Sequence, residues 1–314
     1  MKIVFMGTPD FAVKSLDALV ENNYHIVGVV TAPDKPAGRG QKVHQSAVKK
    51  YALSKGLPVL QPVNLKAPEF INALKSLNAD LQIVVAFRML PEIVWKMPKL
   101  GTFNLHASLL PKYRGAAPIN WAIINGEKET GVTTFFLQHQ IDTGNIILQE
   151  KIKIEPNDTA GTLHDKLMNL GAEIVVKTVQ LIEAGNYKTQ PQNEQLACDA
   201  PKIFKNDCKI NWNKSTEEIY NFIRGLSPYP TAWTSIKNKE TGKLLNLKIF
   251  FAEKMSCTHE HNIGDIIKEN KSFKIAVKKG YIYPTDLQAE GKKRLNVRDF
   301  LNGFKIEDYV INLN

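Results

Sequence analysis

The sequence predicts two domains: an α/β domain with a Rossmann-like parallel sheet, and after it a small β-barrel of the oligonucleotide-binding (OB) type. Three observations support this prediction. Short apolar runs alternate with helical patterns through the first half of the 314 residues. A polar stretch with two prolines and no periodicity follows at 188–207. Short strand patterns then dominate to the end, in a segment where Lys and Arg outnumber Asp and Glu.

The first half alternates strands and helices. An apolar run at 2–6 ends at Gly7-Thr8-Pro9, and apolar residues then recur at helical spacing over 11–20. Further strands are expected at 25–30, 58–60, 81–87 and 102–106, and further helices at 46–55 and 67–77. The run at 81–87 is nearly all apolar, which is typical of a strand buried on both faces. Ligands of such sheets bind beyond the carboxyl ends of the strands.

The second half predicts a barrel with one leading helix. Ser215 and Glu218 have the spacing of a capping box, so a helix is expected over 215–226. Strands are expected at 232–236, 245–252, 264–269, 273–277 and 295–300. The predicted limits are 1–187 for the α/β domain, 188–207 for a linker and 208–314 for the barrel.

Composition narrows the class of protein. No apolar run reaches the length of a membrane helix, and the N-terminal run is too short for a signal peptide, so a cytoplasmic protein is expected. The three widely spaced cysteines predict neither a disulfide framework nor a thiolate metal site. No dinucleotide fingerprint, Walker loop or zinc motif occurs, and no metal is expected. The net charge of +10 fits a polyanionic partner, although solubility alone explains it equally well.

Asn104 and His106 are the strongest candidates for chemistry. They lie two residues apart on the strand predicted at 102–106, so their side chains point to the same face. They also lie at the end of that strand, before a loop rich in Pro and Gly, where active sites of α/β domains form. The pair therefore predicts a functional site.

Two other segments are ambiguous from the residues alone. Asp142 precedes Thr143-Gly144, and a turn aspartate that bonds its own backbone explains this spacing more simply than catalysis does. His139, nearby, has no evident partner and is interpreted as a surface residue. The segment 32–42 combines Pro, Gly and basic residues, which is typical of an exposed loop. It is either a solvated connection or a basic finger that reaches a nucleic acid.

Several separate motifs together resemble the methionyl-tRNA formyltransferase family over essentially the whole chain. Asn104-x-His106, with Ser108-Leu109-Leu110-Pro111 behind it, is similar to the central signature of that family. Asp142-Thr143-Gly144 is similar to its third catalytic segment, and Pro36-Ala37-Gly38-Arg39-Gly40 resembles its loop for the end of the tRNA. Further resemblance lies at 2–12, 114–119, 226–230, 287–293 and 299–303.

The resemblance implies transfer of the formyl group of 10-formyltetrahydrofolate to the α-amino group of methionyl initiator tRNA. Asn104 would donate a hydrogen bond to the developing oxyanion, His106 would move protons, and Asp142 would orient His106. The folate co-substrate would contact residues of two loops, namely Phe87, Leu90, Ser108, Leu109, Leu110 and Pro111. The tRNA would contact basic residues of both domains, namely Arg39, Lys42, Lys292, Lys293 and Arg294.

Two positions depart from the family pattern. Phe87-Arg88 stands where the family usually has Tyr-Gly, and Gln140 stands where it usually has a glycine two residues before the catalytic aspartate.

Two other functions remain open at this point. One is a formyltransferase that acts on a small amine or a nucleotide sugar, and it predicts activity without tRNA. The other is an RNA-binding protein with an inactive formyltransferase-like domain, and it predicts tRNA binding without folate binding. A monomer is expected in each case.

Overall fold

The computed structural model describes residues 1–37 and 42–313, which form two compact units. Unit 1 comprises 1–115, 129–152 and 164–200, and unit 2 comprises 116–128, 153–163 and the chain from Pro201 onward. The segments 116–128 and 153–163 thus group with the C-terminal part, although both precede the predicted linker. Contacts between distant segments decide this grouping, and the order of the chain does not show it.

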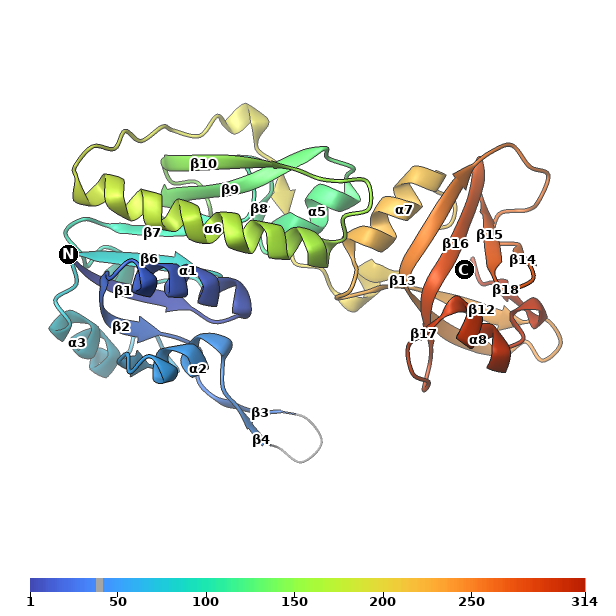
Figure 1. Cartoon of the computed structure of the whole chain (residues 1–314), viewed down its shortest axis with the longest axis horizontal. Helices are drawn as coiled ribbons and strands as arrows, with labels where there is room; N and C mark the ends of the chain where they lie inside the picture. The colour runs from blue at the N-terminus through green and yellow to red at the C-terminus, as the bar shows by residue number, and fades with distance from the viewer. Residues whose placement is uncertain (38–41, 314) are drawn as a thin grey trace. The chain divides into compact units, whose positions relative to one another are not determined.

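Unit 1 is built on a seven-stranded sheet with the strand order β10-β9-β7-β6-β1-β2-β5 (Figure 1). The strands are β1 (Lys2–Gly7), β2 (His25–Val30), β5 (Val59–Leu60), β6 (Leu81–Val85), β7 (Thr102–His106), β9 (Glu129–Phe136) and β10 (Ile146–Lys153). Strands β5, β2, β1, β6 and β7 run parallel to one another, whereas β9 is antiparallel to β7. The predicted Rossmann-like parallel sheet is therefore confirmed.

Helices cover both faces of this sheet. They are α1 (Asp10–Glu21), α2 (Ala47–Ser54), α3 (Pro68–Ser76), α4 (Glu92–Trp95) and the part of α6 (Ala160–Glu183) that belongs to unit 1. Alternate residues of β1 point to opposite faces, and Val4 and Met6 share a buried cluster with Phe70 and Leu74 of α3. Helices α1 and α6 lie together over the other face (Figure 1). The sheet is thus enclosed between two helical layers.

Two details of unit 1 bear on the sequence predictions. Ser46 caps α2, since its Oγ accepts a hydrogen bond from Lys49 N at 3.0 Å, as expected for a helix that starts there. The segment expected to be an exposed loop instead contains the antiparallel strands β3 (Lys35–Ala37) and β4 (Lys42–His44). Arg39 lies outside the described residues.

Unit 2 is an antiparallel, nearly closed barrel, as predicted. Its sheet has the order β14-β15-β16-β13-β12-β18, with β17 beside β16. The strands are β12 (Ala232–Asn238), β13 (Leu244–Ser256), β14 (Ile266–Lys268), β15 (Phe273–Val277), β16 (Gly280–Ala289), β17 (Leu295–Asn296) and β18 (Tyr309–Ile311). Ile311 N donates to Gly264 O at 3.3 Å, which joins the last strand to the residues just before β14. Helices α5 (Pro118–Ile124), α7 (Thr216–Gly225) and α8 (Val297–Gly303) complete the unit.

The strand predicted at 295–300 is wrong beyond its first two residues. Strand β17 ends at Asn296, whose side-chain oxygen accepts a hydrogen bond from Asp299 N at 3.0 Å. This bond caps the N-terminus of α8, so the chain turns into a helix there. Strand β16 was not predicted, although it lies between β13 and β15 near the middle of the barrel.

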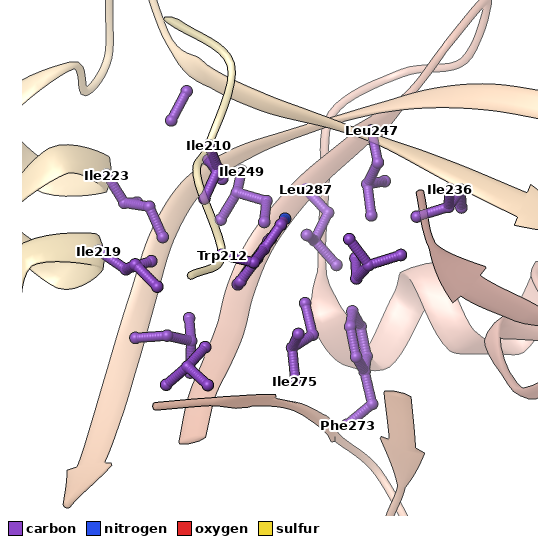
Figure 2. Close-up of a cluster of buried hydrophobic side chains, with 14 of the residues drawn as sticks. Ile210, Trp212, Ile219, Ile223, Ile236, Leu247, Ile249, Phe273, Ile275 and Leu287 are labelled. Carbon is purple, nitrogen blue, oxygen red and sulfur yellow. The ribbon is translucent and has the colours of Figure 1, made fainter. Parts of the chain in front are cut away.

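Trp212 lies at the centre of the barrel core, among side chains from α7 and the barrel strands (Figure 2). Its side chain is almost fully buried, and its indole Nε1 donates to Thr234 Oγ1 at 2.9 Å. We expect Trp212→Ala to lower the free energy of unfolding by about 3–5 kcal/mol, because it leaves a large cavity. Urea denaturation measures this difference.

The control for that measurement is Trp212→Phe, which retains most of the apolar volume but loses the indole donor. It should cost clearly less than alanine. An alanine variant as stable as the phenylalanine variant would show that Trp212 does not organise the core.

Candidate active site

The candidate site lies at the carboxyl end of the parallel strands of unit 1. Strand β1 pairs with β2 on one side and β6 on the other, so the strand order reverses at this point. Crevices that bind ligands form at such reversals, because the connecting loops diverge above and below the sheet. Asn104 and His106 occupy the end of β7, which is the strand next to β6.

Asn104 has a carboxamide available for a ligand. Its backbone is held between Val84 of β6 and Phe135 of β9, which fixes where the side chain begins. The residue is half-buried, and within the described part of the chain no hydrogen bond uses its side chain. A partly desolvated amide that lacks a protein partner, on a backbone held on both sides, is suited to donate to a bound oxygen atom.

His106 is held in one tautomer by the backbone. Its Nε2 lies 2.8 Å from Tyr113 O, and because a carbonyl oxygen can only accept, Nε2 carries the proton. The His106 side chain is 7% exposed, so few ring orientations are open to it. Its other nitrogen, Nδ1, is therefore the one left to exchange a proton with a substrate.

Asp142 lies beside His106. Its Oδ2 is 3.6 Å from His106 Nδ1, which is within ion-pair range but longer than a hydrogen bond. The same oxygen accepts a hydrogen bond from Gly115 N at 2.9 Å. The carboxylate therefore bonds a distant loop instead of its own turn, which removes the simpler interpretation of this residue as a turn aspartate.

The turn that carries Asp142 has a special backbone. Asp142 adopts φ +55, a left-handed conformation that is uncommon for residues other than glycine. A Cβ on Gly144 would lie 1.6 Å from Phe136 O, so only glycine fits at that position. Strained backbone of this kind persists where surrounding contacts hold it, and it concentrates at functional sites.

The loop 108–111 is held by its own side chains and by neighbouring strands. Ser108 Oγ donates to Lys112 O at 2.6 Å, and Thr133 Oγ1 donates to Ser108 O at 2.6 Å. Gln149 Nε2 donates to Leu110 O at 2.7 Å. The side chains of Ser108, Leu110 and Pro111 are buried and that of Leu109 is half-buried. These bonds hold the loop in place, and of its four side chains that of Leu109 is the most accessible to a ligand.

The loop after β6 carries two apolar side chains that pack on the core of unit 1. Leu90 is buried and Phe87 half-buried, and Ala86 before them adopts φ +47. Arg88 donates to the carbonyl oxygens of Val63 and Pro62, and its guanidinium lies over the Phe87 ring at 5.5 Å. Partial burial lowers the pKa of Arg88. Arg88 thus fastens this loop to residues 62–63.

Sequence reasoning missed Gln192, which lies in the predicted linker. Its Nε2 donates to Asp142 O at 2.8 Å and to Gly144 O at 2.9 Å. Around it, Gln190 pairs with Ile146, and β11 (Asp199–Ala200) runs parallel to β8 (Arg114–Gly115). The first part of the predicted linker is therefore packed against the candidate site. The segment 188–207 has no local periodicity, and its sequence shows mainly prolines and polar residues.

Of the other predicted residues, His139 belongs to unit 1 and three basic residues belong to unit 2. His139 is mostly exposed; its Nε2 is 3.5 Å from Glu92 Oε1, and its ring contacts Trp95 edge-on. Lys292 and Lys293 are exposed in the turn between β16 and β17. Neither of them forms an ion pair with another described residue. Arg294 makes two hydrogen bonds to the Asp286 carboxylate and covers the Phe250 ring at 4.1 Å. Asp286 raises the pKa of Arg294 and compensates its charge.

The described residues hold neither a metal-binding cluster nor a membrane-spanning helix. They contain no group of three or more His, Cys, Asp or Glu side chains arranged to hold a metal ion. No helix among them is both long and apolar enough to cross a membrane.

Comparisons with known proteins match both units. Residues 1–179 match the family model described as formyl transferase, and residues 202–305 match that of the formyl transferase C-terminal domain. A methionyl-tRNA formyltransferase of Parabacteroides distasonis is 57% identical over 99% of this chain and 98% of its own length. One of Flavobacterium johnsoniae is 56% identical over 98% of both chains.

Solved structures share the fold at low sequence identity. The crystal structure of the sugar 3N-formyltransferase WlaRD, in the presence of dTDP and 5-N-formyl-THF, covers 93% of this chain and 99% of its own, with a TM-score of 0.64 and 24% identity. An N-formyltransferase from Helicobacter canadensis, in complex with folinic acid and dTDP-3-aminofucose, covers 90% of this chain and 98% of its own. Its TM-score is 0.65 at 23% identity.

Proposed function

The chain belongs to the formyltransferase family, and we propose that it transfers the formyl group of 10-formyltetrahydrofolate to the α-amino group of methionyl initiator tRNA. The product is formylmethionyl-tRNA for translation initiation. The observation that carries this proposal is full-length similarity, at 52–57% identity, to relatives named methionyl-tRNA formyltransferase. We assign the folate chemistry to residues 1–187 and tRNA binding to 208–314, in a cytoplasmic monomer.

Asn104 stabilises charge in the first half of the reaction. A neutral amine attacks the formyl carbon, and the electron pair of the carbonyl bond moves onto oxygen. The Asn104 carboxamide, which has no protein partner in the described residues, donates a hydrogen bond to that oxygen. No covalent bond to the protein forms in this step.

His106 moves the proton that the second half of the reaction requires. The attacking nitrogen becomes cationic and must lose a proton, while the folate nitrogen must gain one before its bond to the formyl carbon breaks. His106 Nδ1 accepts the first proton and delivers the second, because Nε2 stays bonded to Tyr113 O. The Asp142 carboxylate, 3.6 Å from Nδ1, stabilises the imidazolium between the two transfers.

The residues around this pair fit a folate. The loop after β6 offers an apolar wall of Phe87 and Leu90, and the loop 108–111 offers Leu109 and backbone groups. A pterin ring needs such a combination of flat apolar surface and hydrogen-bonding backbone. Arg88 assists by fastening the wall to residues 62–63.

The tRNA is bound largely through its phosphates, for which the exposed Lys292 and Lys293 are the best candidates in the barrel. Arg39 and Lys42 are assigned to the acceptor end of the tRNA on the resemblance alone. Arg294 contributes less, because Asp286 already pairs with it. Two uncompensated lysines in one turn provide a local attraction for a polyanion.

We expect Lys292→Gln/Lys293→Gln to raise the KM for methionyl-tRNA several-fold and to leave kcat unchanged. The slope of log KM against log salt should fall by about one for each lost phosphate contact. Steady-state assays over a range of KCl concentrations measure both effects. The control, Lys66→Gln/Lys75→Gln, removes two exposed lysines of unit 1. Equal slopes for the two double variants would contradict the assignment.

A panel of acceptors tests the proposed function. The purified protein is given 10-formyltetrahydrofolate with methionyl initiator tRNA, free methionine or a nucleotide-linked amino sugar, and the formylated products are separated. Rapid transfer to the charged tRNA alone is expected. Transfer to the amino sugar or to free methionine at a comparable rate would contradict the proposal.

A further inference from the structure

We propose that Gln192 is a positioning residue, which fixes the Asp142 turn so that its carboxylate faces His106. This inference rests on the proposed function, because it concerns the rate of the same transfer. Gln192 acts through Asp142 and does not itself touch the substrate. This role would involve a residue of the predicted linker, 188–207, in catalysis.

The orientation of the Gln192 carboxamide is fixed by its neighbours. On one side, Asp142 O and Gly144 O can only accept, so the group at 2.8 and 2.9 Å from them is the Nε2 amide. On the other side, Arg114 can only donate, and its Nη2 and Nε lie 2.7 and 3.1 Å from Oε1. Both donors and the acceptor of the carboxamide are therefore used, and a flipped amide would lose all four contacts.

Glu194 holds Arg114, the residue that donates to the Gln192 side-chain oxygen. Its carboxylate accepts from Arg114 Nη1 at 2.8 Å and from Nη2 at 2.7 Å, which is a bidentate pair. Arg114 lowers the pKa of Glu194, and Glu194 raises that of Arg114. Gln192 is thus placed by an ion pair between Glu194, on its own segment, and Arg114 of β8, and it has little freedom to move.

The Asp142 turn needs such a support. Residue 142 has a left-handed backbone that L residues rarely adopt, and the carbonyl oxygens of 142 and 144 converge on one point. Without a donor between them, these two dipoles repel, and the turn can relax. Because Asp142 Oδ2 is already 3.6 Å from His106 Nδ1, a small further shift weakens its influence on the imidazolium.

The test compares three single variants. Gln192→Ala removes both the donors to the Asp142 turn and the acceptor for Arg114. Gln192→Glu retains the acceptor for Arg114 but loses the two donors. Gln195→Ala is the matched control, because Gln195 lies three residues away with an exposed side chain. We expect both Gln192 variants to lower kcat by about tenfold to hundredfold. The KM for methionyl-tRNA and the affinity for 5-formyltetrahydrofolate, a nonreactive probe, should stay at the values of the control.

A double-mutant cycle separates positioning from a general structural role. Titration with the folate probe counts folded sites, and rates are expressed per site. In an Asp142→Asn background, Gln192→Ala should have no further effect on kcat, because the carboxylate it positions is gone. Full additivity of the two losses would overturn the inference, and so would Gln192 variants that match Gln195→Ala. A wild-type protein that formylates no charged tRNA would instead contradict the proposed function.

Discussion

Replacing His106 by alanine is expected to lower kcat for formyl transfer by about 10²- to 10⁴-fold, the usual worth of a positioned general acid–base group. The loss should fall on kcat, because in the proposed mechanism Nδ1 moves a proton between the two substrate nitrogens. Affinity for 5-formyltetrahydrofolate should stay near that of the wild type. Single-turnover rates with methionyl-tRNA measure the effect on the chemical step.

His139→Ala is the matched control for this substitution. His139 is a mostly exposed histidine of the same unit, and its contacts to Glu92 and Trp95 lie outside the site. The control should keep wild-type kcat. If His106→Ala also kept it, the proton transfers would have to pass through another group, and the role assigned to His106 would be wrong.

Replacing Asn104 by alanine should lower kcat by about 10²- to 10³-fold, which is the cost of removing one preorganised oxyanion donor. Asn104→Asp should be at least as damaging, because it puts a negative charge beside the developing negative charge. Both substitutions leave the backbone pairing of β7 with β6 and β9 intact, so the fold should be retained. Single-turnover transfer at saturating folate again isolates the chemical step.

The control is Asn72→Ala, since Asn72 is exposed on α3. An Asn104→Ala variant that transfers formyl as fast as Asn72→Ala would exclude the oxyanion role. A variant that loses folate affinity and keeps kcat at saturation would assign Asn104 to binding of the ground state.

The predictable part of the site is the part that local rules determine. Asn104 and His106 could be named as candidates because the two-residue period of a strand and the position at its end are visible in the sequence. Ser215 marked the start of α7 because its capping box with Glu218 is local, and the structure contains that box. The alternation of strands and helices sufficed to predict the parallel sheet.

The remaining part depends on contacts between distant segments. Gln192 meets the Asp142 turn across 50 residues of sequence, and no local pattern encodes that meeting. Likewise, the simpler explanation of Asp142 failed because its hydrogen-bond partner, Gly115, lies 27 residues away. Strand β16 was not predicted because Pro284, Asp286 and Gln288 interrupt its apolar pattern. In the structure, pairing with β13 and β15 overrides that weak local preference.

The most direct test of the central claim is single-turnover transfer of labelled formyl from 10-formyltetrahydrofolate to methionyl initiator tRNA. Wild type, Asn104→Ala, His106→Ala and Asp142→Asn are compared at equal occupancy by folate and tRNA. A fast wild-type transfer, with each variant slowed strongly at unchanged occupancy, is the predicted result. Rates that differ little between wild type and the three variants would contradict the assignment of catalysis to this cluster at the end of β7.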